Sequence, residues 1–271
     1  MAGPVITFLS DYGLSDEFVG ICHGVIAGIC PQARVIDLTH GIPRHDARAG
    51  AVILADSLRF MPVGVHLAVV DPGVGTERRA VALRLADERR LVGPDNGLLS
   101  LAAAAGGGIV EAVDIADSAF RLQPVAATFH GRDIFAPVAA ALAGGAALAE
   151  AGAPLDPALL VRLEQDDPRL DDGTLVARVR SIDRFGNLQL NAGPGSLAGV
   201  GLGLGVGATL TLAGGGASHA ARYVRTFADA APGELIVYED AQRRAAVAVS
   251  HGDAAERLGL RAGDELRIRF G

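Results

Sequence analysis

The residues best suited to chemistry are polar clusters that stand where predicted strands end. One cluster is the segment DPGVGTERR at 71–79, which offers a carboxylate at Asp71 and guanidinium groups at Arg78 and Arg79. Its two glycines allow the backbone to turn tightly and to approach a ligand closely. The segment lacks the Gly-Lys-Ser/Thr ending of a phosphate-binding loop. Taken alone, it is equally compatible with a structural turn that carries two solvated arginines.

Two more clusters flank predicted helices. His130 stands in TFHGRD at 128–133, ahead of an Ala-rich helix, where the helix dipole disfavours positive charge and therefore favours the neutral imidazole. Asp11 stands in SDYG at 10–13, after the first predicted strand. A carboxylate there could accept both hydroxyls of a ribose. On position alone a helix-capping role is favoured for Asp11, because Asp before a helix accepts backbone N–H bonds.

The remaining polar segments allow structural explanations. GPDNG at 93–97 has the composition of a tight turn, and IDRFGN at 182–187 offers Asp183 and Asn187 on a predicted hairpin turn. Asp37 and His40 follow a strand, yet no spacing of His, Cys and Asp matches a structural zinc site. The sequence therefore implies neither a metal nor a cofactor.

The elements that must position these residues alternate between strand and helix up to about residue 145. Strands are predicted at 5–9, 35–36, 65–70, 80–85, 91–92 and 108–115, and helices at 18–29, 47–60 and 134–142. This order predicts a layered α/β domain with a mostly parallel sheet, whose ligands bind beyond the carboxyl ends of its strands.

The chain changes character after a Pro- and Asp-rich stretch at 151–174, which indicates a boundary with one short helix near Leu159. Beyond it, short apolar runs alternate with Gly-rich turns such as 201–203 and 214–216, which predicts a small all-β barrel. We expect an N-terminal α/β domain at 1–165 and a smaller C-terminal β-barrel domain at 173–271.

Charge and composition exclude several classes of partner. The formal net charge is −7 and the chain has no long Lys/Arg run, which argues against nucleic acid and anionic membranes. No secretory leader or membrane span is recognisable, so we expect a cytoplasmic protein. Cys22 and Cys30 stand in an apolar stretch, which favours buried thiols over a disulfide.

Taken together, the segments 10–13, 71–75, 93–97, 128–133 and 183–187 resemble, in order, the SAM hydroxide adenosyltransferase family, as does GDAA at 252–255. This family is related to the SAM-dependent fluorinase and chlorinase. The resemblance implies hydrolysis of S-adenosyl-L-methionine (SAM) to adenosine and L-methionine by attack of water at C5′, with no cofactor. It also implies a homotrimer whose sites lie between the N-terminal domain of one subunit and the barrel of its neighbour.

By the same resemblance, the family's catalytic triad falls on Asp71, Arg78 and His130, with Arg79 as the alternative arginine. Asp11 would hold the ribose, Asp183 and Asn187 would contact the adenosine or methionine end, and Phe227 would pack against adenine. The segment 240–243, DAQR, departs from the Asn-Ser-Ser-Gly-like turn that grips methionine in related chains.

Two other functions stay open on sequence grounds. One is a halogenase that uses chloride in place of water, although halogenases tend to carry Tyr near the positions of Asp71 and His130. The other is a non-catalytic sensor of SAM or adenosine, since a fold alone does not establish activity.

Overall fold

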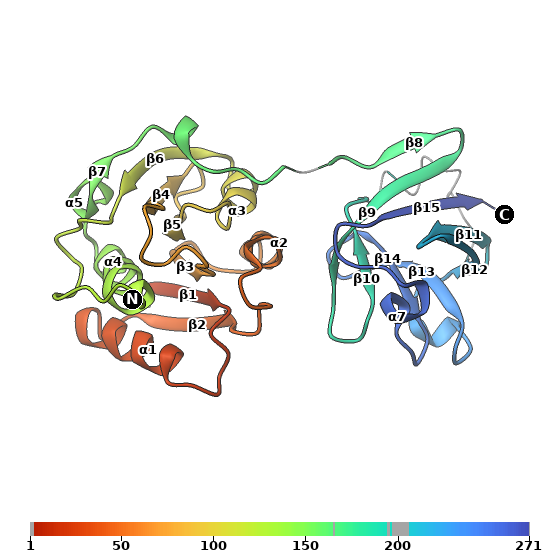
Figure 1. The fold of residues 1–271 in the computed structure, drawn as a ribbon, viewed down its shortest axis with the longest axis horizontal. Coiled ribbons are helices and arrows are strands. Elements are labelled where there is room, and N and C mark those ends of the chain that lie inside the picture. Colours follow the sequence, from red (N-terminus) through yellow and green to blue (C-terminus); the bar gives the residue numbers. More distant parts are fainter. Residues whose placement is uncertain (1–2, 165, 194–195, 197–205, 271) are drawn as a thin grey trace. The chain divides into compact units, whose positions relative to one another are not determined.

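The computed structural model describes residues 3–164, 166–193, 196 and 206–270. The chain forms two compact units that divide between Leu163 and Glu164 (Figure 1). The predicted Gly-rich turn at 201–203 lies outside the described residues.

The first unit is built on a seven-stranded sheet in the order β2-β1-β3-β5-β4-β6-β7. The first four strands in this order run parallel to one another. Each of the remaining strands, β4, β6 and β7, runs antiparallel to the strand before it in this order. In chain order the strands are β1 (Val5–Ser10), β2 (Arg34–Thr39), β3 (Val65–Val69), β4 (Ala80–Leu85), β5 (Arg90–Pro94), β6 (Ile109–Asp114) and β7 (Ala153–Pro154). The predicted layered α/β domain with a mostly parallel core is therefore confirmed.

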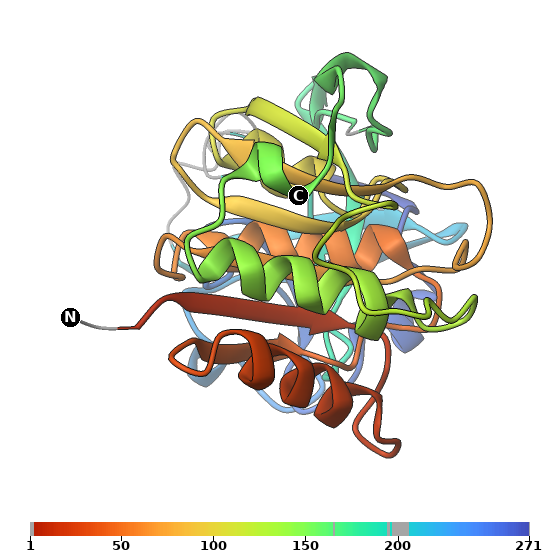
Figure 2. The same cartoon turned by 90° about the vertical axis from the view of Figure 1, so that its left-hand side faces the viewer.

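Helices cover both faces of this sheet. The helices are α1 (Phe18–Ile29), α2 (Ala47–Leu58), α3 (Ser100–Ala105), α4 (Ala136–Ala143), α5 (Leu148–Ala151) and the single 3-10 turn η2 (Pro157–Leu159). Helices α1 and α4 pack on the face that carries Ile6 and Phe8, whereas α2 and α3 pack on the face that carries Leu9 (Figure 2). Successive residues of β1 thus enter opposite cores, as the alternation of a strand requires.

The helix predicted at 134–142 is preceded by a π-helical turn, η1 (Gly131–Phe135). The backbone N–H of Ala136 bonds to the carbonyl of Gly131, five residues earlier. Pro137 lacks an N–H to continue an ordinary ladder, so the chain enters α4 through this wider turn. The prediction also missed α3, which begins three residues after Gly97 in an Ala-rich run.

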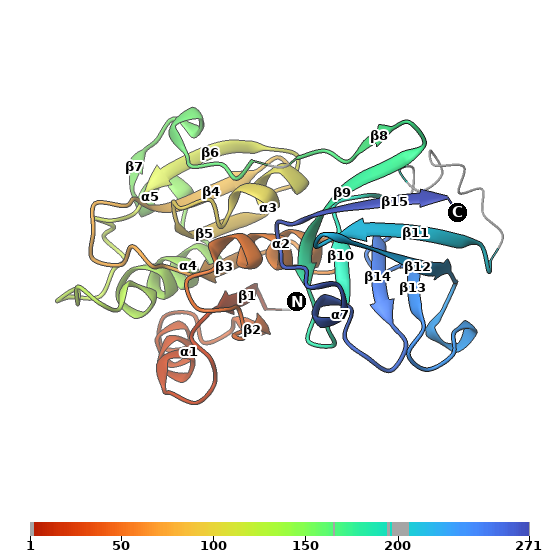
Figure 3. The same ribbon diagram turned by 45° about the vertical axis from the view of Figure 1, so that its right-hand side comes forward.

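The second unit is a seven-stranded barrel closed by pairing of β9 with β10, with β8 added alongside β9 (Figure 3). Its strands are β8 (Arg169–Asp171), β9 (Thr174–Ile182), β10 (Leu188–Leu190), β11 (Thr209–Gly214), β12 (Ala217–Tyr223), β13 (Leu235–Glu239), β14 (Ala245–Val249) and β15 (Glu265–Phe270). The short helices are η3 (Phe227–Asp229) and α7 (Ala254–Leu258). The all-β barrel is confirmed, and Gly214–Gly216 forms the predicted turn between β11 and β12. Strand β8 lies before the predicted boundary at 173.

Two smaller expectations can be compared with the structure. Cys22 and Cys30 are both free and buried, as predicted. Of the helices in the described part of the chain, none has the length and apolar character that a membrane span requires.

Candidate active site

Asp71, Arg78 and His130 meet in the first unit. The Nε of Arg78 donates to Asp71 Oδ1 at 2.8 Å, and its Nη2 makes a further close contact with Asp71 Oδ2. The same Nη2 lies 2.8 Å from Nδ1 of His130. A single guanidinium therefore holds a carboxylate on one side and an imidazole on the other.

Local structure explains why these three residues converge. Asp71 lies two residues after the end of the buried strand β3, and the turn that follows places Arg78 beside Asp71. Gly75 has a φ of +77°, and a Cβ there would lie 2.5 Å from the carbonyl oxygen of Ala127. The turn after β3 therefore approaches the segment before His130 so closely that only glycine fits.

The π-helical turn η1 supplies the rest of the support. His130 occupies its N-cap, as the sequence predicted for a helix N-terminus. Phe135, at the end of the same turn, lies under the Arg78 guanidinium with 5.2 Å between Cζ and the ring centroid. Arg78 is thus held by an ion pair, a hydrogen bond and a cation–π contact.

Burial lowers the pKa of His130, and the nearby Arg78 guanidinium lowers it further, against smaller opposing effects of Asp71 and Asp133. The neutral imidazole is therefore favoured. Because arginine has no acceptor atom, Nδ1 of His130 must accept the bond from Arg78, and the neutral ring carries its proton on Nε2.

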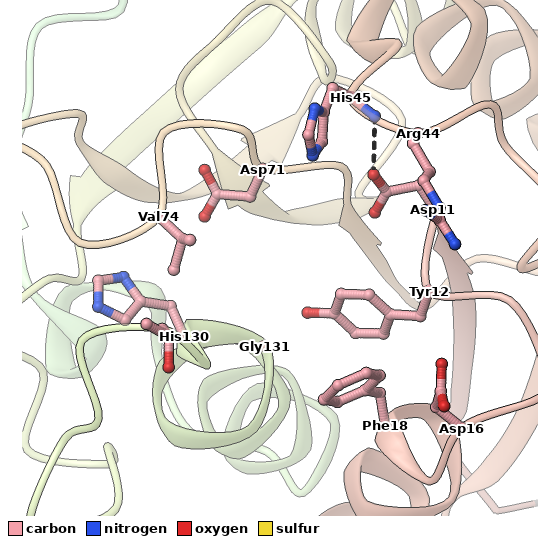
Figure 4. A pocket seen from close by; sticks show the side chains of 11 residues that line it. Asp11, Tyr12, Asp16, Phe18, Arg44, His45, Asp71, Val74, His130 and Gly131 are labelled. Carbon is pink, nitrogen blue, oxygen red and sulfur yellow. Dashed lines mark hydrogen bonds between the residues drawn. The ribbon is translucent and has the colours of Figure 1, made fainter.

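A cavity of about 290 Å³ lies beside this triad (Figure 4). This volume is close to the lower end of the range of about 300–1,000 Å³ that small-molecule sites occupy. Asp71, Val74 and His130 line one side, and Asp11, Tyr12 and Phe18 line the other (Figure 4). Asp16, Arg44, His45, Thr128 and Gly131 complete the lining.

Asp11 does not cap helix α1, so that expectation is wrong. The N-cap of α1 is Glu17, and Asp11 Oδ2 instead accepts a bond of 2.9 Å from the backbone N–H of His45. His45 has a φ of +66°, a strained conformation for a residue with a side chain. The loop is thus bent to present its N–H to Asp11 at the edge of the cavity.

The two arginines of the segment 71–79 have different environments. Arg79 Nη1 donates to Asp95 at 3.2 Å and to the carbonyl of Leu159 at 3.0 Å. It makes structural contacts, whereas Arg78 contacts Asp71 and His130. The GPDNG segment is structural too, because Asn96 Nδ2 bonds to the Val70 carbonyl at 2.8 Å.

The remaining sequence-predicted residues lie in the second unit. Asp183 organises the turn between β9 and β10: its Oδ1 accepts from the backbone N–H of Asn187 at 3.0 Å, and its Oδ2 accepts from Asn187 Nδ2 at 2.8 Å. The turn also packs against the GDAA segment, since the carbonyl of Gly186 accepts bonds from the N–H groups of Ala254 and Ala255. Two segments of the family resemblance are thus neighbours.

Phe227 begins the short helix η3 and packs against Tyr238 with 5.0 Å between ring centroids. It remains 43% exposed, so one part of its ring is free to contact a ligand. The DAQR segment at 240–243 forms the turn between β13 and β14, where Asp240 Oδ1 accepts from the backbone N–H of Gln242 and of Arg244.

Sequence reasoning missed the other cavity residues, notably Arg44, His45 and Tyr12. Arg44 and His45 lie in an aperiodic loop between β2 and α2 and had no strand or helix pattern to mark them. Phe18 was expected only as the first residue of the helix predicted at 18–29, yet it is 37% exposed and lines the cavity.

Both units of the chain are similar to known proteins. The SAM hydroxide adenosyltransferase N-terminal domain matches residues 6–152, and the C-terminal domain of the same family matches residues 177–267. An (R)-S-adenosyl-L-methionine hydrolase of Salinispora tropica is 49% identical, over 99% of this chain and 98% of that protein. A fluorinase of Nocardia brasiliensis is 32% identical, over 69% of this chain and 71% of its own length.

A crystal structure of an uncharacterized conserved protein from Thermotoga maritima superimposes with a TM-score of 0.90 at 33% identity, covering 97% of this chain and 99% of that one. Sequence and structure thus match over both units. The chain belongs to the SAM hydroxide adenosyltransferase family.

Proposed function

We propose that this protein hydrolyses SAM to adenosine and L-methionine at the Asp71–Arg78–His130 site. The observation that carries the proposal is the Arg78 guanidinium bonded to both Asp71 and His130 beside a cavity of suitable size. The identity of 49% to a SAM hydrolase over the full chain supports the same reaction.

In the proposed reaction the oxygen of water attacks C5′ of SAM. The C5′–S bond breaks, and its electron pair stays on sulfur, which leaves as the neutral thioether of methionine. The leaving group needs no proton, so the catalytic task is to activate water. Lowering the pKa of water from 15.7 to about 7 corresponds to roughly 12 kcal/mol. A fixed cation next to the proton acceptor would supply part of this energy, because it stabilises the developing hydroxide.

We assign proton acceptance to Asp71. His130 already accepts the Arg78 bond at Nδ1, and its Nε2 carries a proton, so neither ring nitrogen is free to act as a base. His130 would instead donate from Nε2 to the attacking oxygen, and Arg78 would stabilise the negative charge shared by Asp71 and the nascent hydroxide. Asp71→Asn should then abolish turnover, whereas His130→Gln, which keeps an N–H donor, should retain more of it.

The substrate contacts are proposals of the same kind. Asp11 lies at the cavity edge with one carboxylate oxygen engaged by the loop, which leaves lone pairs for ribose hydroxyls. Asp183, Asn187 and Phe227 would serve the adenosine or methionine end from the barrel of a neighbouring subunit in a homotrimer. Light scattering tests the trimer. Turnover by mixed trimers of Asp71→Asn and Phe227→Ala chains tests the sharing of sites, because unaltered active sites reform only if each site uses two chains.

Incubation of the purified protein with SAM, followed by chromatography, tests the reaction. Adenosine and methionine should appear in equal amounts, and in ¹⁸O-labelled water the label should enter the 5′-hydroxyl. Chloride-dependent formation of 5′-chloroadenosine would identify a halogenase instead. Tight binding of SAM without any product would identify a sensor.

A further inference from the structure

We propose that His23, Asp37 and His40 form a binding site for a divalent transition-metal ion, with Zn²⁺ as the best match. His23 comes from helix α1, Asp37 from strand β2, and His40 directly follows that strand. Their ligand atoms all lie within 4.8 Å of one another. The proposal is independent of the reaction assigned above.

The spacing of the ligand atoms suits a metal ion. His23 Nε2 lies 2.9 Å from Asp37 Oδ1, and His40 Nε2 lies 3.1 Å from the same oxygen. With zinc-to-ligand bonds of about 2.0–2.1 Å, neighbouring ligand atoms of a tetrahedral site stand about 3.4 Å apart. Both distances to Asp37 are a few tenths of an ångström shorter than this spacing, so a small rotation of the side chains would open them to the separation that zinc requires.

The buried histidine supplies a second and independent indication. His40 is only 5% exposed, and its buried Nε2 makes no hydrogen bond, although Asp37 Oδ1 lies 3.1 Å away. A buried polar atom without a partner destabilises the folded protein, because it has lost its hydrogen bonds to water. A metal ion between Nε2 and Asp37 would satisfy both groups.

The other ring nitrogen of His40 is held in the way metal-binding histidines usually are. Its Nδ1 lies 2.7 Å from Ser10 Oγ at the end of β1. Such an outer partner fixes the ring orientation and leaves Nε2 to face the metal. Ser10 is fully buried, so this orientation is rigid.

Access and ligand chemistry favour zinc over harder cations. The side chains of His23 and Asp37 are 35% and 40% exposed, so an ion and a water as fourth ligand can enter from solvent. Two imidazoles and one carboxylate suit Zn²⁺, whereas Mg²⁺ and Ca²⁺ prefer oxygen ligands. The ion would tie helix α1 to the end of β2, and the His40 carbonyl there accepts a bond from Gly13, close to Asp11.

The test is calorimetric titration of the tag-free full chain, stripped of metal by a chelator, with Zn²⁺, and absorption spectroscopy with Co²⁺. One ion should bind per chain, raise the melting temperature and give the visible bands of tetrahedral cobalt. His23→Ala and Asp37→Asn should each weaken zinc binding at least about tenfold. His251→Asn is the matched control, because His251 is an exposed histidine whose φ of +57° asparagine tolerates.

Wild-type protein that binds no zinc would overturn the proposal, and so would His23 and Asp37 variants that bind as tightly as the control. Circular dichroism of each variant shows whether it is folded. Since the wild-type titration needs no variant, its result decides the proposal even if a substitution prevents folding.

Discussion

Nη2 of Arg78 lies 2.8 Å from Nδ1 of His130, which makes the arginine the donor and the imidazole the acceptor. Protonation of Nδ1 would place two cations in contact and break this bond. Burial and Arg78 accordingly lower the pKa of His130 below its ordinary value of 6.5. The arrangement of the site thus depends on a neutral histidine.

The first prediction concerns this pKa. In NMR titrations the pKa of His130 should lie below its ordinary value of 6.5, and kcat should fall as the pH drops through this lowered pKa, because the imidazole becomes charged. Arg78→Gln removes a neighbouring cation and leaves Asp71, which raises the pKa, so the His130 titration should move to higher pH. An unchanged titration in this variant would show that the two groups are not coupled.

The second prediction separates the two arginines. Lysine cannot contact both Asp71 and His130 through a rigid planar group, so Arg78→Lys should lower kcat by about 10²–10³ and change SAM affinity little. Arg79→Lys is the matched control. Arg79 pairs with Asp95 and not with the triad, so this substitution should leave kcat nearly unchanged. Single-turnover kinetics measures both. Equal kcat values for the two variants would remove Arg78 from the mechanism.

The third prediction concerns Asp11. Asp11→Asn keeps an oxygen for the N–H of His45 but loses the charge, whereas Asp11→Ala loses both. If the carboxylate binds ribose, calorimetry should show adenosine affinity lower by about 10–100-fold in both variants. If Asp11 only holds the loop, the Asn variant should bind adenosine like the wild-type protein, which would exclude the ribose contact.

Sequence pattern predicted most of the fold because the core follows simple periodicity. Helix α1 has the predicted bounds, and strands β1, β3 and β4 agree to within a residue at each end. The π-helical turn was not predictable, since it depends on how the chain enters α4 at Pro137 against the sheet. Local pattern carries no information about such packing.

The site was predictable only in part for the same reason. Asp71 and His130 could be predicted because they stand at the end of a strand and at the start of a helix. The choice between Arg78 and Arg79 could not be predicted from pattern, since it depends on which guanidinium the turn directs toward His130. His23 shows the limit more clearly. No spacing within one segment could connect it with Asp37 and His40, because parallel pairing of β1 and β2 and the packing of α1 bring them together.

The fourth prediction concerns stability and His66, which is fully buried and bonded through Nδ1 to Thr7 Oγ1 at 2.8 Å. Burial, assisted by Arg89, lowers the pKa of His66 to about 4. The unfolded chain therefore takes up a proton before the folded protein does, and stability is full above about pH 6.5 and declines as the pH falls toward 4. The loss should reach about 3 kcal/mol.

Urea unfolding of wild-type protein and His66→Gln at about pH 7 and about pH 4.5 measures this difference. The glutamine variant should be less stable at neutral pH, since it disturbs the core, but its stability should fall less on acidification. Parallel losses in the two proteins would assign the acid sensitivity to other groups.

The fifth prediction concerns Gly131, because a Cβ at this position would lie 2.1 Å from the hydroxyl oxygen of Tyr12. Tyr12 is fixed by edge contacts with Phe8 and Phe129, so the added methyl group should force the ring into the cavity that it lines. Gly131→Ala should weaken SAM binding at least about tenfold and destabilise the fold by about 1–3 kcal/mol.

Gly24→Ala is the matched control, because Gly24 lies on helix α1 and a methyl group added there would have nothing within 4 Å, so alanine should raise stability by up to about 1 kcal/mol. Adding Tyr12→Phe to Gly131→Ala removes the atom nearest the new methyl group and should restore part of the SAM affinity. Calorimetry and thermal unfolding of the three variants check this. If Gly131→Ala binds SAM normally, the tyrosine ring does not define the wall of the substrate cavity.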